Sequence, residues 1–153
     1  MANHVRRQVR EAIATRLTGL TTTGARVYVN NVDPLAVAEL PALTIRNGAE
    51  QIDRQSLGSP NPYVRRAQTV IVSAHVRATS APADTIDEIA KEVEVAMCGT
   101  IDAITLGGLA VDTMLVAIDE PRISGDGERI VASADMQFQV LLNAREGIPD
   151  AVI

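Results

Sequence analysis

Two long stretches of this chain alternate between apolar and polar side chains, and this alternation limits the fold more than any other feature. In residues 128–143 every second side chain is apolar: Ile130, Ala132, Ala134, Met136, Phe138, Val140 and Leu142. Residues 64–77 repeat the pattern through Val70, Val72, Ala74 and Val76. Because successive side chains of a strand point to opposite faces, both stretches predict long strands of a sheet with one apolar and one polar face.

Two segments with helical periodicity supply a cover for the apolar face. Residues 4–18 place Val5, Val9, Ala12, Ile13 and Leu17 on one side of a helix. Residues 82–98 do the same with Ile86, Ile89, Ala90, Val93 and Met97, with Ser80 or Asp84 as the expected N-cap. Two helices with single apolar stripes are enough to cover one face of a sheet.

The remaining segments complete the expected order of elements. We expect shorter strands at 26–30, 42–47 and 110–120, with an extended continuation at 50–54, a hairpin turn at 124–127 and an irregular tail from residue 144. The order α-β-β-β-α-β-β predicts an α+β fold. Its architecture is a two-layer sandwich, in which a mainly antiparallel sheet of four to five strands carries two helices on one face.

Length and composition are those of one globular domain. The chain has 153 residues, of which 46% are hydrophobic and 22% charged, so we expect a single domain over 1–143 with an extension over 144–153. Aromatic residues make up only 2%, which predicts an aliphatic core. It also argues against base-stacking platforms and sugar-binding clefts, because both need exposed rings.

The sequence contains no catalytic or metal-binding pattern. Cys98 is the single cysteine, and His4 and His75 are the only histidines. No HExxH, CxxC, GxSxG or phosphate-binding glycine loop occurs. We therefore expect no catalytic residues, no metal, no cofactor and no enzyme activity. The first 17 residues lack the apolar run of a signal peptide, and residues 103–118 are apolar but interrupted by Gly107, Gly108 and Asp112. We therefore expect a protein that is made and kept in a cytoplasm.

Charge is distributed unevenly along the chain. The formal net charge is -5, with 9 basic and 5 acidic residues in positions 1–66 against 5 basic and 14 acidic in positions 67–153. An acidic chain is not an electrostatic nucleic-acid binder by default. The asymmetry indicates either two oppositely charged surfaces or no more than chance.

Three short stretches point to a known family. Residues 39–45 read ELPALTI and are followed by Gly48-Ala49-Glu50, the helix from Asp84 to Met97 begins DTIDEI, and the closing strand begins ASADMQF at Ala132. In their order and spacing, over about residues 3–143, they resemble the tail terminator (tail completion) family of lambda-like, long-tailed bacteriophages. The chain departs from that pattern in its few aromatics and its longer C-terminal tail.

The resemblance implies a structural virion protein without catalysis. Members of the family form a hexameric ring that caps the head-proximal end of the tail tube, ends tube polymerisation and provides a docking surface for the head connector. The implied partners are further copies of the chain, the tube protein and a connector or neck protein. The genome would pass through the ring without sequence-specific binding, and no membrane is involved. The implied location is the virion tail, with assembly in the host cytoplasm.

Within such a ring, three sets of residues are candidate sites. Subunit contacts through complementary charge are predicted for a basic set (Arg6, Arg7, Arg10, Arg65 and Arg66) and an acidic set (Asp87, Glu88, Glu92 and Glu94). Partner binding is predicted for the loop and tail residues Ser56, Leu57, Gly58, Pro60, Pro62, Ile148, Val152 and Ile153. The polar sheet face, poor in lysine and arginine, is predicted to line the channel through Thr69, Ser73, His75, Ser133, Asp135, Gln137 and Gln139.

Other interpretations of the same residues stay open. The tail could be a disordered end, and the polar sheet face could be an ordinary solvated surface. The chain could be another phage neck or head-completion protein. It could also be a small ligand-binding domain or enzyme that uses the polar face as a floor.

Overall fold

The fold is built around two 15-residue strands, β3 (Tyr63–Arg77) and β6 (Val131–Arg145). A computed structural model describes residues 2–31, 35–58, 60–78, 81–125 and 130–153. In it the two strands pair antiparallel over their whole length, from Tyr63 opposite Arg145 to Arg77 opposite Val131. Every even-numbered residue of both strands is buried, and most odd-numbered residues are partly exposed. The alternation predicted from the sequence is thereby confirmed.

Five further strands extend this pair into a mixed, seven-stranded sheet. β2 (Ala42–Arg54) lies antiparallel to β3, and the short β1 (Val27–Val29) lies parallel to β2. Along the other side of β6 lie β7 (Ile148–Val152), β4 (Asp112–Ile118) and β5 (Arg122–Ser124). The α+β class is confirmed, but the sheet has more strands than the four to five expected.

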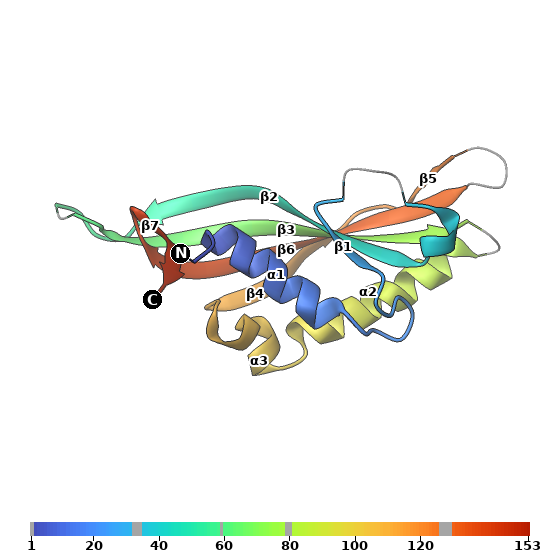
Figure 1. The fold of residues 1–153 in the computed structure, drawn as a ribbon, viewed down its shortest axis with the longest axis horizontal. Helices are drawn as coiled ribbons and strands as arrows, with labels where there is room; N and C mark the ends of the chain where they lie inside the picture. The colour runs from blue at the N-terminus through green and yellow to red at the C-terminus, as the bar shows by residue number, and fades with distance from the viewer. Residues whose placement is uncertain (1, 32–34, 59, 79–80, 126–129) are drawn as a thin grey trace.

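One face of the sheet carries the helices (Figure 1). α1 (Val5–Leu17) fully buries Val5, Val9, Ile13 and Leu17, and α2 (Pro82–Cys98) buries Ile86, Ile89, Ala90, Val93 and Met97. These side chains pack on the even-numbered residues of β3 and β6 in one hydrophobic core. Short 3₁₀ turns lie at Val37–Glu39 and Leu106–Gly108.

The helix α3 (Ile101–Ile104) and the start of α2 differ from the expectation. α3, which periodicity could not predict because it has only four residues, begins where Thr100 Oγ1 accepts a hydrogen bond from the Ala103 N–H. The N-cap of α2 is Ala81 in a left-handed conformation without a side-chain cap, so Asp84 is not the cap. Asp84 lies within the first turn instead. Ser80, the other expected cap, lies outside the described residues, as do positions 126 and 127 of the expected hairpin turn.

The C-terminal segment joins the sheet, so the expectation of an irregular tail from residue 144 is wrong. β6 continues through the fully buried Ala144 to Arg145. A turn at Glu146 and Gly147, where Gly147 has a φ of 83°, sends the chain back as β7. Val152 then lies opposite Ala144 and packs against the core. The turn contains a single glycine and no proline, which is a weak signal in a sequence.

The sheet is longer than the helical layer that covers it. Figure 1 shows the β2–β3 end projecting past α1 on one side, and the β5–β6 end projecting past α2 on the other. Both chain termini lie near the β2–β3 end. The core therefore occupies the middle of the molecule, and both ends of the sheet are available for other contacts.

A buried ion pair lies on the helix-covered face of the sheet beside α1. Glu50 follows the bulge that shifts the register between Asn47 and Glu50, and it pairs with Arg66 at 2.8 Å with both side chains only 8% exposed. Next to them the fully buried Gln68 donates to Asn47 Oδ1 at 2.9 Å and to the Arg6 carbonyl at 3.2 Å. The apolar core thus gives way to a polar cluster at the N-terminal end of α1.

Removing one partner of this pair should cost more stability than removing both. Glu50→Ala leaves Arg66 buried without its counter-charge, which we expect to cost about 3–5 kcal/mol of unfolding free energy, whereas Glu50→Leu combined with Arg66→Met should cost much less. The matched control is Glu11→Ala, whose partner Arg7 is exposed, for a cost of about 0–1 kcal/mol. Urea unfolding measures all three. An equal loss for Glu50→Ala and Glu11→Ala would contradict this account.

Candidate functional site

The sheet face opposite the helices carries all seven residues predicted to line a channel. Register places Thr69 opposite Gln139, Ser73 opposite Asp135 and His75 opposite Ser133, while Gln137 lies opposite Ile71. Residues directly opposite one another in a ladder share a face. The structure therefore brings the seven together on what we call the open face, and their role in a channel stays a prediction.

Asp135 is the centre of the polar network on this face. Its side chain is 10% exposed and accepts hydrogen bonds from Ser73 Oγ at 2.6 Å, Arg46 Nη2 at 3.0 Å and Arg122 Nη2 at 3.1 Å. Burial by itself would raise the pKa of the carboxyl group. The hydrogen bonds from Ser73 and Arg46 and the charges of Arg46 and Arg122 outweigh it and hold the pKa below its ordinary value. Asp135 is therefore ionised at neutral pH and ties β2, β3, β5 and β6 together.

His75 lies next to this network. Its Nε2 is 2.9 Å from Thr44 Oγ1. Burial lowers the pKa of the imidazole from its ordinary value; the charge of Asp135 opposes this, and those of Arg46 and Arg122 add to it. The ring is therefore neutral near pH 7 and serves as a hydrogen-bonding group of the face.

The open face is not poor in arginine, and that part of the prediction is wrong. Arg46 comes from β2 and Arg122 from β5, and both reach Asp135. Toward the ends of the two long strands the same face carries Arg65, Arg77 and Arg145. The expected hairpin turn at 124–127 includes only Ser124 of β5, and the sequence predicts no element for Arg122. No signal in the sequence indicates which residues of β2 lie beside β3.

The basic residues predicted to form a subunit contact are not one surface. Arg66 is buried against Glu50, while its neighbour Arg65 lies on the open face. Arg6 donates to the Gly48 carbonyl at 2.9 Å, Arg7 pairs with Glu11, and Arg10 is partly buried on α1. Alternation along β3 separates the adjacent Arg65 and Arg66 onto opposite faces, which their adjacency in sequence conceals.

The acidic set remains together on α2. Asp87, Glu88 and Glu94 are exposed there. Glu92 is partly buried and accepts hydrogen bonds from the N–H of Thr22 at 3.2 Å and from its hydroxyl at 3.0 Å. It thus holds the turn after α1 against α2. A role for these carboxylates in subunit contacts stays a prediction.

The predicted partner-binding loop and tail lie at the same end of the molecule. Ser56, Leu57, Gly58, Pro60 and Pro62 connect β2 to β3, with Leu57 exposed and Pro62 buried. Ile148 and Ile153 are exposed on or beside β7, whereas Val152 packs against the core.

Side-chain contacts clamp this loop to the tail. Arg54 makes a bidentate pair with Glu146, with distances down to 2.6 Å, and Asn61 Nδ2 donates to the Glu146 carbonyl at 2.9 Å. The guanidinium of Arg145 lies 4.2 Å from the centre of the Tyr63 ring. Residues more than 80 positions apart in sequence therefore form one surface, which we call the clamped tip.

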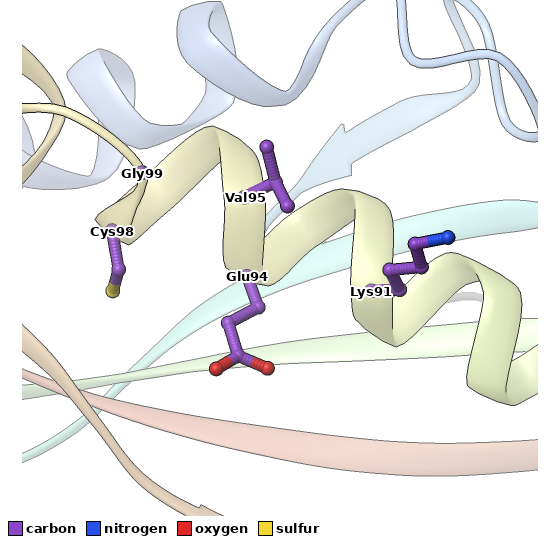
Figure 2. A pocket seen from close by; sticks show the side chains of 5 residues that line it. All are labelled: Lys91, Glu94, Val95, Cys98 and Gly99. Carbon is purple, nitrogen blue, oxygen red and sulfur yellow. The ribbon is translucent and has the colours of Figure 1, made fainter.

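A shallow depression of about 290 Å³ lies along α2 and is lined by Lys91, Glu94, Val95, Cys98 and Gly99. Figure 2 shows Glu94 and Cys98 pointing to the same side of the helix. The Cys98 thiol donates to the Thr113 carbonyl on β4 at 3.8 Å, and burial raises its pKa. The thiol is therefore protonated at neutral pH and is not an activated nucleophile.

Searches for two other kinds of site give negative results for the part of the chain that the structure describes. No group of three or more His, Cys, Asp or Glu side chains there is arranged to hold a metal ion. No helix over the same positions has the length and apolar character needed to cross a bilayer.

Comparisons with known proteins give matches among solved structures only. No protein-family model matches the sequence, and a search of curated proteins finds no match. Among solved structures, a chain in the virion of a native gene transfer agent particle aligns over 93% of this chain and 92% of its own length, with a TM-score of 0.39 and 17% identity. A likeness at this level assigns no function.

Neutralising Asp135 should destabilise the fold in a pH-dependent way. Asp135→Asn removes a charged acceptor from two guanidinium groups, which we expect to cost about 2–3 kcal/mol at pH 7. Because the folded pKa is lowered, the ionised carboxyl contributes its full stability above its unfolded pKa of about 3.9 and loses it as the pH falls through the folded pKa.

The measurement is urea unfolding of parent and variant between pH 7 and pH 3. The free-energy gap should be constant down to about pH 4 and narrow below it. The control is Asp119→Asn, which changes an exposed carboxylate that accepts from Gln137. A gap that does not narrow in acid would rule out Asp135 as the ionised centre.

Proposed function

We propose that this chain is a structural protein that assembles into a closed ring at the head-proximal end of a phage-type tail tube. There it ends tube polymerisation and gives the head connector a docking surface, as in the terminator family that its sequence resembles. The open face is the observation that carries the proposal. It runs along 15-residue strands, about 50 Å, and helices cover only the reverse side of the sheet. In a ring whose sheets face the lumen and whose helices face outward, the open face of each sheet lines the channel and the other face packs against the helices.

The chemistry of the open face suits a passage for DNA. Thr69, Gln137 and Gln139 form a band of uncharged side chains between the Asp135 network and the arginines near the clamped tip, and the carboxylate of Asp119 accepts a hydrogen bond from Gln137 at its edge. Arg46 and Arg122 are both hydrogen-bonded to Asp135, which offsets part of their charge. A wall of free cations would hold phosphates through counterion release. A wall with an uncharged band and partly neutralised arginines holds them more weakly, and the genome passes without sequence-specific contacts.

The clamped tip is the proposed docking point for a partner. It combines the exposed Leu57, Ile148 and Ile153 with the Arg54–Glu146 ion pair and the hydrogen bond from Asn61 to the Glu146 carbonyl. Exposed apolar side chains on a well-held support are a common form of recognition surface. In this proposal its partner is the tube protein or the connector. The chain acts in the virion after assembly in the host cytoplasm, without catalysis and without a membrane.

Capping of tail tubes tests the proposal directly. When the purified chain is added to its cognate tube protein during polymerisation, we expect tube growth to stop and electron microscopy to show a ring at one end of each tube. An equal amount of the chain unfolded by heat is the control. Unchanged tube growth with rings bound to purified neck or connector proteins would assign the chain to a neck or head-completion role instead.

Placing cations on the uncharged band should impair DNA passage without preventing assembly. Gln137→Arg with Gln139→Arg adds two charges to each subunit of the lumen wall, and we expect normal rings but at least a tenfold loss of infectivity through slow packaging or ejection. The control adds two charges elsewhere, through Thr15→Arg and Ala83→Arg, at exposed positions of α1 and α2. Full infectivity of the first variant would show that this face does not line the channel.

A further inference from the structure

α2 carries a second depression on the side that faces the turn after α1. Its volume is about 460 Å³, and its walls are residues 19–21 and the adjoining face of α2. The shallow depression of about 290 Å³ lies on the other side, where Cys98 reaches β4. Lys91 and Val95 belong to the walls of both, and Figure 2 shows Val95 pointing to the opposite side of the helix from Cys98. The two depressions and the ridge between them form one surface, which we call the α2 saddle.

The α2 saddle has an apolar centre and negative walls. Val95, on the ridge, is 64% exposed. Glu88 lies in the wall of one depression and Glu94 in the wall of the other. Both are exposed, and neither carboxylate forms an ion pair or a hydrogen bond with another described residue. Lys91 is the single cation of α2, and the last turn has no basic residue to offset the negative end of the helix dipole. The saddle therefore favours an apolar segment that carries positive charges.

A second copy of the chain offers no matching surface among its described residues. Of the arginines described, only Arg10, Arg65 and Arg77 have guanidinium groups without a hydrogen bond or an ion pair inside the chain. Arg10 is partly buried on α1, and Arg65 and Arg77 lie near opposite ends of β3. A contact between α2 and α2 of another copy would bring together five carboxylates and one lysine from each side, and like charges that face one another oppose association. Charge complementarity therefore points to a different protein.

We propose that the α2 saddle binds a basic amphipathic helix of another protein. That helix crosses α2 at Val95, places one apolar side chain in each depression, and sets lysine or arginine side chains against Glu88 and Glu94. The spacing fits, because the depressions lie on either side of a helix about 10–12 Å across, and residues seven apart on one face of a helix are separated by about 10.5 Å. An amphipathic helix in an apolar groove is a common mode of recognition.

The α2 saddle and the clamped tip are separate surfaces. The clamped tip is formed by the connection between β2 and β3 and by β7, whereas the saddle is formed by α2 and the turn after α1. Binding at the saddle does not depend on the proposed ring. In a ring whose helices face outward, α2 stays accessible, so a single copy and a closed ring would both bind the basic helix.

Fluorescence anisotropy with labelled model peptides measures this binding. The probe is a helical peptide with two leucines seven residues apart, alanines between them on the same face, and lysines on both flanks. A second peptide has glutamate in place of each lysine, and a third has serine in place of both leucines. We expect the first peptide to bind and the other two to bind about tenfold more weakly, because the saddle needs both positive charge and apolar anchors.

Variants of the saddle test where the peptide binds. Glu88→Gln with Glu94→Gln removes the two wall charges, and Val95→Gln removes the apolar ridge; all three side chains are exposed, so the fold should tolerate these changes. Each variant should bind the lysine peptide about tenfold more weakly than the parent. The control, Asp53→Asn with Glu120→Gln, removes the same charge at exposed positions on β2 and after β4 and should bind like the parent.

Several results would overturn the assignment of the saddle. They are no binding of the lysine peptide, equal binding of the three peptides, and equal weakening by the saddle variants and the control, which would show a general attraction to an acidic protein. Light scattering adds one more: self-association of the parent that Glu88→Gln with Glu94→Gln abolishes would mean that a second copy occupies the saddle. The capping assay is read separately. A chain that caps tubes but binds no peptide refutes the saddle alone, and a chain that binds the peptide but does not cap tubes refutes the proposed function alone.

Discussion

The antiparallel pairing of β3 with β6 is the constraint on which the rest of the structure depends. Fifteen residues of each strand stay in register without a bulge. Even-numbered positions therefore face the helices and odd-numbered positions face away over the full length of both strands. A shift by one residue would turn Phe138 and Val70 outward and bring Asp135 and Ser73 into the core. The two faces, the helical cover and the position of the polar network all follow from this single ladder.

The alternation and the two apolar stripes were sufficient to predict the class, both long helices and the long strands. They are strong signals because each repeats a local pattern over ten or more residues. β5 and β7 have three and five residues, too few to establish a period. They are strands because β6 offers them a free side, which is a property of the assembled sheet. The helix α3 was not predicted either, because its four residues are also too few to show a period.

The candidate sites are formed in part by contacts between strands, and these contacts could not be predicted from the sequence. The alternation along β3 and along β6 placed Ser73, His75, Asp135 and Gln137 on a common polar face, as the sequence indicated. It could not show that Arg46 and Arg122 would reach Asp135, because that contact needs the register of four strands. In the same way, proximity in sequence grouped Arg65 with Arg66, and the pleat separated them. A local pattern determines a face, whereas cross-strand register determines its charge.

The unbroken ladder of β3 and β6 has a consequence for the evolution of the chain. Even-numbered positions of both strands face the helices and odd-numbered positions face away. Homologous chains should therefore accept polar substitutions at odd-numbered positions and keep apolar residues at most even-numbered ones. An insertion of one residue in either strand would reverse this parity beyond it, so chain length should vary in the connections and not within the two strands.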